Sequence, residues 1–209
     1  MNFNKIHDFR KQFIANNKSK DHVVIEGNSN VLISAPHGVS QVRLGKYKLA
    51  EIGALAAALY LHKESNSYFI AKTQNNNDDA NFDDKSLYKS SIEKLIKNKK
   101  VKYIIDIHGL SPKRDCDINL GTHLRNNIKT NEKIFNNLYE ALVENGFVTK
   151  IDQPFMAGKQ TICGSFANKL PKIWTLQIEI NCAITNKKEN VEKFKRLLTI
   201  LKSWINSIQ

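Results

Sequence analysis

The chain has 209 residues, and its 32 Lys and Arg residues against 20 Asp and Glu residues give a formal net charge of +12. This length suits one domain that can bury its own core, so we expect a single domain over residues 1–209. The basic residues are spread along the chain without a stripe of interleaved aromatics, which excludes the usual pattern of a nucleic-acid-binding protein. The excess charge is either a solvated, Lys-rich surface or a means of attracting an anionic substrate.

The cysteines and the N-terminal segment are informative about the cellular compartment of the protein. Three cysteines are present, and none form a CxxC pair, so neither a disulfide framework nor a Cys-rich zinc site is expected. This cysteine usage fits a reducing compartment. Residues 1–17 contain no signal-peptide core, and no apolar run reaches the roughly 18 residues that a transmembrane helix needs. We therefore expect a soluble, cytoplasmic protein that does not bind membranes.

In chain order, apolar periodicity and turn residues predict alternating helices and strands. In the first half the predicted elements are a helix over 3–16, strands over 22–26 and 31–35 joined by a turn, a helix over 47–63, a strand over 67–73, a polar Asn- and Asp-rich loop over 74–84 and a helix over 85–98. In the second half they are strands over 101–107 and 117–120, a helix over 131–145, a loop over 150–168, a strand over 173–180 and a final helix from about 186. Strands that alternate with helices predict a layered α/β fold.

Two of the predicted strands end in the same way. The apolar run that begins at Tyr103 ends in Asp106, Ile107, His108 and Gly109, and the strand over 31–35 is followed by His37 and Gly38. Strand alternation places Asp106 and His108 on one face, and the ends of strands are where α/β sheets build their sites. Imidazole nitrogen is a common zinc ligand, so the pair of histidines predicts a metal site.

A catalytic zinc site needs a third protein ligand. We expect Glu51, which follows His37 by 14 residues and opens a predicted helix, to supply it. Asp106 is the alternative, either as a ligand or as the group that orients one of the histidines. The sequence does not decide between the two carboxylates.

Glu179 lies inside a strand whose other face is apolar. Alternation puts Gln177, Glu179 and Asn181 together on the opposite face. A buried carboxylate is costly unless it is paired or used, and a general base or acid beside a metal site would be such a use. Glu179 is therefore predicted to be the catalytic residue.

Two further segments suggest substrate contacts. Arg43 follows His37 closely, and a guanidinium can hold a carboxylate through two parallel hydrogen bonds. The polar run over residues 75–84 does not match a calcium loop and is either a plain loop or a cap over the crevice. We expect Asn81, within this run, to contact the substrate.

These residues resemble the N-formylglutamate amidohydrolase-like family, among the zinc-carboxypeptidase-like hydrolases. The resemblance spans residues 35–181 and rests on the order and spacing of six motifs: Ala35-Pro36-His37-Gly38, Arg43-x-Gly45-Lys46-x-Lys48-x-x-Glu51, Asp79-Ala80-Asn81-Phe82, Asp106-Ile107-His108-Gly109, Asp117-Ile118-Asn119-Leu120-Gly121-Thr122 and Glu179-Ile180-Asn181.

The resemblance implies a mixed, mostly parallel β-sheet flanked by helices on both faces, one zinc ion and hydrolysis of an amide. It implies that His37 and His108 are zinc ligands and that Glu179 activates water. Carboxypeptidase relatives carry a Glu a few residues after the first His, but residues 38–42 contain none, so Glu51 is assigned by position.

We therefore expect a zinc-dependent hydrolase of an amide bond in an N-acyl amino acid or a peptide that carries a carboxylate. Two alternatives stay open: hydrolysis of an acidic polymer such as polyglutamate, which the charge of +12 would suit, and a non-catalytic binding protein that retains the fold. The sequence leaves the acyl group and the oligomeric state undetermined.

Overall fold

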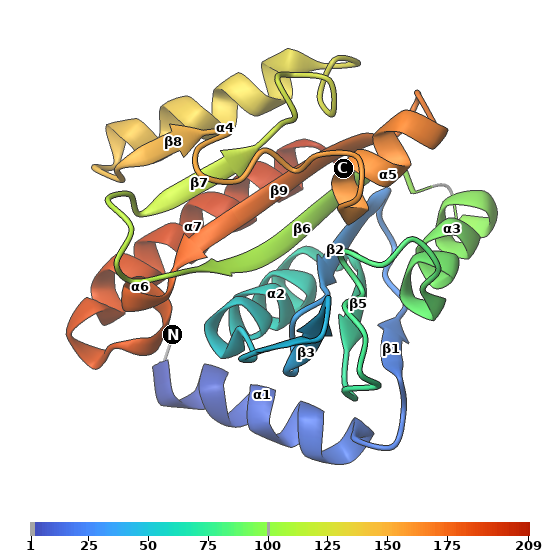
Figure 1. The fold of residues 1–209 in the computed structure, drawn as a ribbon. Helices are drawn as coiled ribbons and strands as arrows, with labels where there is room; N and C mark the ends of the chain where they lie inside the picture. The colour runs from blue at the N-terminus through green and yellow to red at the C-terminus, as the bar shows by residue number, and fades with distance from the viewer. Residues whose placement is uncertain (1–2, 100) are drawn as a thin grey trace.

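A seven-stranded sheet between two groups of helices forms the centre of the computed structural model, which describes residues 3–99 and 101–209 (Figure 1). The strands are β1 (His22–Ile25), β2 (Val31–Ala35), β3 (Gln41–Arg43), β4 (Lys46–Lys48), β5 (Tyr68–Lys72), β6 (Tyr103–Leu110), β7 (Ile118–Gly121), β8 (Thr149–Ile151) and β9 (Trp174–Asn181). The helices are α1 (Phe3–Asn17), α2 (Ile52–Ser65), α3 (Leu87–Lys99), α4 (Glu132–Glu144), α5 (Ile162–Lys169), α6 (Cys182–Asn186), the 3₁₀ helix η1 (Lys188–Asn190) and α7 (Val191–Ser207).

The order of strands in the main sheet is β1-β5-β2-β6-β9-β7-β8. The four central strands β5, β2, β6 and β9 run parallel, whereas β1 pairs antiparallel with β5 and β7 pairs antiparallel with β9. The predicted mixed, mostly parallel sheet is confirmed. The turn after β1 does not pair the first two strands with each other, because β5 lies between β1 and β2.

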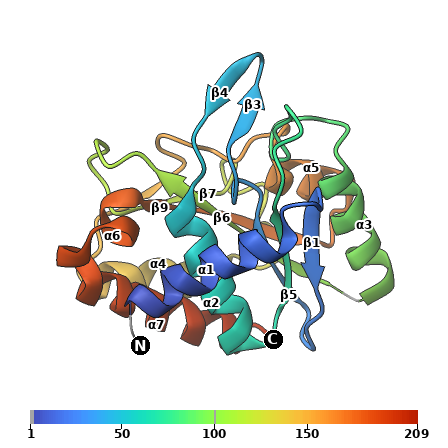
Figure 2. The same ribbon diagram turned by 90° about the horizontal axis from the view of Figure 1, so that it is seen from below.

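Alternation along the strands divides the core between the two faces of the sheet. On one face, residues such as Ile33, Ile105 and Leu176 pack against α1, α2, α4 and α7, which lie together below the sheet in Figure 2. On the other face, Leu32 and Ile104 pack against α3 and α5. The helices on both faces agree with the expected fold.

Helix α2 begins at Ile52, five residues later than predicted. Residues 41–48 form instead the two-stranded hairpin β3–β4, which projects from the body of the protein (Figure 2). Leu44 and Gly45 at its tip have φ of 50° and 73°, the backbone of a two-residue hairpin turn. The Ala-rich pattern after residue 52 is helical, but the polar run before it belongs to the hairpin.

The predicted loop over 150–168 is partly wrong, since it contains the end of β8 and most of α5. Strand β8 has only three residues, all partly exposed, at the edge of the sheet beside β7, so it leaves a weak hydrophobic pattern in the sequence. Helix α5 has eight residues and begins at Ile162, and the N-cap Thr161 accepts a hydrogen bond from the Gly164 amide at Oγ1 (3.1 Å). The last long helix starts at Val191, after the short α6 and η1.

No helix in the described part of the chain combines the length and the apolar character needed to span a bilayer.

Candidate metal centre and active-site cleft

The parallel strands β2, β6 and β9 end at the same edge of the sheet, and the candidate site lies there. His37 follows β2 by two residues, while His108 and Glu179 lie near the ends of β6 and β9. The register pairs Asp106 with Gln177 and His108 with Glu179, so these four side chains share one face. It is the face whose apolar part is covered by α3 and α5, and the polar ends of the strands extend it.

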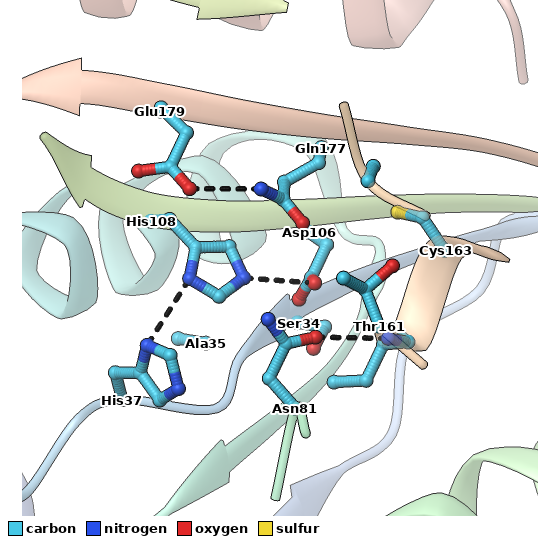
Figure 3. Close-up of polar contacts among 12 residues, drawn as sticks. Ser34, Ala35, His37, Asn81, Asp106, His108, Thr161, Cys163, Gln177 and Glu179 are labelled. Atoms are coloured by element: carbon cyan, nitrogen blue, oxygen red, sulfur yellow. Dashed lines mark hydrogen bonds and ion pairs between the residues drawn. The ribbon is translucent and has the colours of Figure 1, made fainter. Parts of the chain in front are cut away.

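The two histidines and Glu51 converge on one point. His37 Nδ1 lies 3.2 Å from His108 Nδ1 and 2.9 Å from Glu51 Oε1, and His108 Nδ1 lies 3.4 Å from Glu51 Oε2 (Figure 3 shows the histidine pair). One ligand atom from each residue lies within 4.8 Å of the others. The structure thus brings together the three residues that the sequence predicted as metal ligands.

Local backbone geometry places Glu51 in this group. Glu51 precedes α2, and its amide donates to the His37 carbonyl (2.9 Å), which folds the start of the helix back onto the end of β2. The Gly109 amide donates to Glu51 Oε2 (2.8 Å). A Cβ on Gly109 would lie 3.1 Å from the Glu51 Cβ, so a glycine here permits the close approach.

Each histidine is held from behind by a buried aspartate. His37 Nε2 donates to Asp79 Oδ1 (3.0 Å), and His108 Nε2 donates to Asp106 Oδ2 (2.9 Å). Once it is deprotonated, an imidazole that donates through Nε2 presents the lone pair of Nδ1, and Nδ1 of both histidines points at the shared centre. Asp106 therefore lies behind His108 rather than beside Glu51, a position from which it can orient the histidine.

Sequence reasoning did not single out Asp79 as a partner of His37. It lies in the Asn- and Asp-rich run whose composition predicts only a loop, and only its place in the Asp79-Ala80-Asn81-Phe82 motif hinted at a role. The aspartate also accepts from Arg43 Nε at Oδ2 (2.7 Å), so it joins the hairpin to the histidine.

The histidines and carboxylates of this network shift one another's pKa values toward the charged forms. Burial opposes protonation of His37, but the charge of Glu51 and hydrogen bonds to Asp79 and Glu51 outweigh it and raise its pKa to about 9. Burial likewise opposes ionisation of Glu51 and Asp79, yet the neighbouring histidines, and Arg43 in the case of Asp79, hold both pKa values well below their usual range. The carboxylates are therefore anionic at neutral pH, whereas His37 must release its proton when a metal binds.

Glu179 behaves differently from these carboxylates. Burial is the main reason that its pKa rises to about 7; the charges of Glu51 and Asp106 add to the shift, while the two histidines oppose it. Among the described residues its hydrogen-bond partner is Gln177, whose Nε2 donates to Glu179 Oε1 (2.8 Å; Figure 3). A carboxyl group with a pKa near neutrality can accept and return a proton.

A cleft of about 460 Å³ opens over these residues. Its lining includes Arg43 and Lys48 from the hairpin, Asn81 from the polar run and the segment 154–158. Asn81 is held by its Oδ1, which accepts from the Ile162 amide (2.8 Å), so its side chain keeps one orientation at the cleft. Both predicted substrate-contacting residues, Arg43 and Asn81, thus reach the same cleft as Glu179.

The sheet order and the strand-end cluster place the chain in the mixed α/β fold that the resemblance implied. Neither a family model nor a curated protein matches the sequence. Solved structures do match the fold. The N-formylglutamate amidohydrolase of Ralstonia eutropha JMP134 shows 12% identity over 90% of this chain and 96% of that one, with a TM-score of 0.57.

Two other solved structures match over a similar extent. A bacteriophage poly-gamma-glutamate hydrolase shows 13% identity over 90% of this chain and 89% of that one, with a TM-score of 0.61. The zinc-free apo form of YNDL shows 20% identity over 95% and 96% of the two chains, with a TM-score of 0.54. At these identities the likeness establishes a common fold.

Proposed function

We propose that the protein is a zinc-dependent hydrolase of an amide bond in an N-acyl amino acid or a peptide that carries a carboxylate. The observation that carries this proposal is the convergence of His37 Nδ1, His108 Nδ1 and Glu51 at the floor of a cleft that also contains Glu179. The fold shared with an amidohydrolase and a poly-gamma-glutamate hydrolase supports it.

The donor atoms fit zinc in kind and in spacing. Two imidazole nitrogens and one carboxylate are a common ligand set of catalytic zinc, which keeps a fourth position open. The two histidine nitrogens lie 3.2 Å apart, close to the edge of a tetrahedron of ligands around zinc, ~3.3 Å for the usual bond lengths, and each has a different oxygen of the Glu51 carboxylate within 3.4 Å. Asp79 and Asp106 complete the site by fixing the tautomer of each histidine.

The proposed chemistry divides the work between these groups. Zinc in the site would polarise the scissile carbonyl and lower the pKa of a water molecule. Glu179 accepts a proton from the attacking water and returns it to the leaving nitrogen. Gln177 holds Oε1 of Glu179, which leaves Oε2 for the proton transfer.

Arg43 is the proposed anchor of the substrate carboxylate. Its bond to Asp79 uses only Nε, and its guanidinium lies 5.2 Å from the centre of the Phe82 ring. The terminal nitrogens are thereby left for an incoming acceptor in a fixed orientation. Lys48, which lines the same cleft, adds a second positive charge.

An acidic polymer is the second candidate substrate. The net charge of +12 and the fold shared with a poly-gamma-glutamate hydrolase favour it. Attraction between exposed charges weakens with salt, so turnover of a polymer would fall steeply as ionic strength rises. Turnover of a small N-acyl amino acid would depend on salt much less.

Metal analysis and an amidase assay together test the proposal. We expect about one zinc per chain, loss of hydrolysis of N-acetyl-L-glutamate on chelation and recovery on addition of zinc. A folded chain that binds no zinc under any loading condition would support the alternative of a non-catalytic binding protein.

A further inference from the structure

The cleft is lined by two segments of different chemistry. The hairpin contributes the cations of Arg43 and Lys48, whereas residues 154–158 contribute Pro154, Phe155, Met156, Ala157 and Gly158. Phe155 and Met156 keep 41% and 40% of their surface exposed. Two large apolar side chains left in solvent beside a candidate active site have no role in the catalytic chemistry described above.

The backbone beneath these side chains is held firmly. Three consecutive carbonyls accept hydrogen bonds: that of Phe155 from Asn119 Nδ2 (2.9 Å), that of Met156 from the His123 amide (2.6 Å) and that of Ala157 from Asn127 Nδ2 (2.9 Å). Asn119 is fully buried and Asn127 nearly so. The structure thus uses two buried amides to hold a short segment whose side chains it leaves exposed.

The residues just before this segment are also held by hydrogen bonds. Asn119 Oδ1 accepts from the Gln153 amide (2.8 Å), so this asparagine holds the segment at two points. Asp152, one residue earlier, accepts from the backbone amides of three consecutive residues, Thr122, His123 and Leu124. A surface held in this way loses little conformational entropy when it binds a ligand.

We propose that the substrate carries an apolar acyl group on the scissile amide, and that Phe155 and Met156 bind this group. The inference rests on the proposed hydrolase function. If Arg43 and Lys48 hold the carboxylate of the amino-acid part, the apolar wall is left for the acyl part. In the reaction the water oxygen bonds to the acyl carbon, the C–N bond breaks, and the nitrogen leaves as an amine after receiving a proton.

A series of N-acyl-L-glutamates tests the proposal, because only the acyl group changes. With the zinc-loaded enzyme we expect kcat/KM to rise from formyl through acetyl, butanoyl and hexanoyl to phenylacetyl. Each buried methylene should raise kcat/KM by about fourfold, the factor that corresponds to the transfer free energy of a CH₂ group. A flat or falling series would overturn the proposal.

Substitutions assign the effect to the two side chains. Phe155→Ser and Met156→Ser should each reduce the phenylacetyl-to-acetyl ratio of kcat/KM by roughly tenfold, and Phe155→Leu should retain most of it. Val148→Ser is the matched control, since Val148 is 55% exposed but does not line the cleft, and it should leave the ratio unchanged. Serine variants that keep the full ratio would overturn the assignment.

A binding measurement separates this inference from the proposed function. In the Glu179→Gln variant, intact ligands can be titrated by calorimetry without turnover. N-phenylacetyl-L-glutamate should bind at least tenfold more tightly than N-acetyl-L-glutamate, and Phe155→Ser in this background should remove the difference. If no amide is hydrolysed by the parent enzyme but this difference appears, the proposed reaction fails and the apolar subsite stands. Equal affinities would overturn the subsite.

Discussion

Two clusters of buried charged side chains lie at the ends of the neighbouring parallel strands β2 and β5. Two consecutive residues, Asp79 and Asp78, each contribute a carboxylate to one of the clusters. Asp79 holds His37 and Arg43 in the candidate site. Asp78, the preceding residue, accepts from Lys72 Nζ (2.6 Å) at the end of β5. Lys72 also donates to Asp21 (2.5 Å), which in turn binds His22.

The clusters differ in how their charges are compensated. In the Lys72 cluster, formed by Lys72, Asp21, Asp78 and His22, the buried cation lies between two carboxylates, and its partners are already in place. In the candidate site, two histidine nitrogens point at one centre, and no cation among the described residues forms an ion pair with Glu179. Burial of charge is thus common to both, whereas convergent histidine nitrogens and a carboxyl group without an ion-pair partner distinguish the candidate site.

The largest difference between the clusters should appear on removal of a ligand. His37→Ala and His108→Ala should each abolish zinc binding, because two remaining ligands cannot form the site. Zinc content of the purified variants, measured with circular dichroism as a check on folding, tests this. A folded double variant that still held stoichiometric zinc would refute the assignment.

Glu179→Gln should lower kcat by roughly 10²–10⁴, the range expected for loss of a general acid or base, with zinc content unchanged. The ligands determine metal affinity, whereas Glu179 acts only as the transition state forms. Zinc content and rate are measured on one preparation. Loss of zinc would make Glu179 a ligand, and an unchanged rate on a confirmed substrate would exclude this mechanism.

Lys72→Met should affect stability alone. It leaves two partly exposed carboxylates without their buried cation, and we expect a loss of about 2 kcal/mol in the free energy of unfolding. Urea denaturation measures the loss, while zinc content should stay at the wild-type value. Lys97→Met, which removes an exposed ion pair with Glu93, is the control and should leave the midpoint of unfolding nearly unchanged.

The smallest expected effect is a change in zinc affinity, and it distinguishes the two candidate ligand carboxylates, Glu51 and Asp106. Asp106→Asn should weaken zinc binding by roughly 10–100-fold, as expected for a group that orients a ligand, and Glu51→Gln should weaken it more. Zinc titration against a competing chelator compares the two variants. The reverse order would promote Asp106 to the ligand.

The alternation of strands and helices was predictable because buried parallel strands and amphipathic helices leave strong local patterns. The strand from Tyr103 and the helix through Phe194, Leu197, Leu198 and Leu201 were found for this reason. The hairpin over 41–48 and the short α5 were missed. Their residues gain their structure from a turn with positive φ and from a helix cap, which hydrophobic periodicity does not report.

The residue types at the ends of the central strands are visible in the sequence, and they led to the choice of His37, His108 and Glu179. How these side chains meet depends on contacts between segments that are far apart in the chain. Glu51 reaches the histidines because its amide binds the His37 carbonyl and Gly109 lets its side chain approach. Asp79 and Phe155 lie in loops whose composition predicts no role for them. Their positions at the cleft depend on hydrogen bonds to residues distant in the chain, which the local sequence does not reveal.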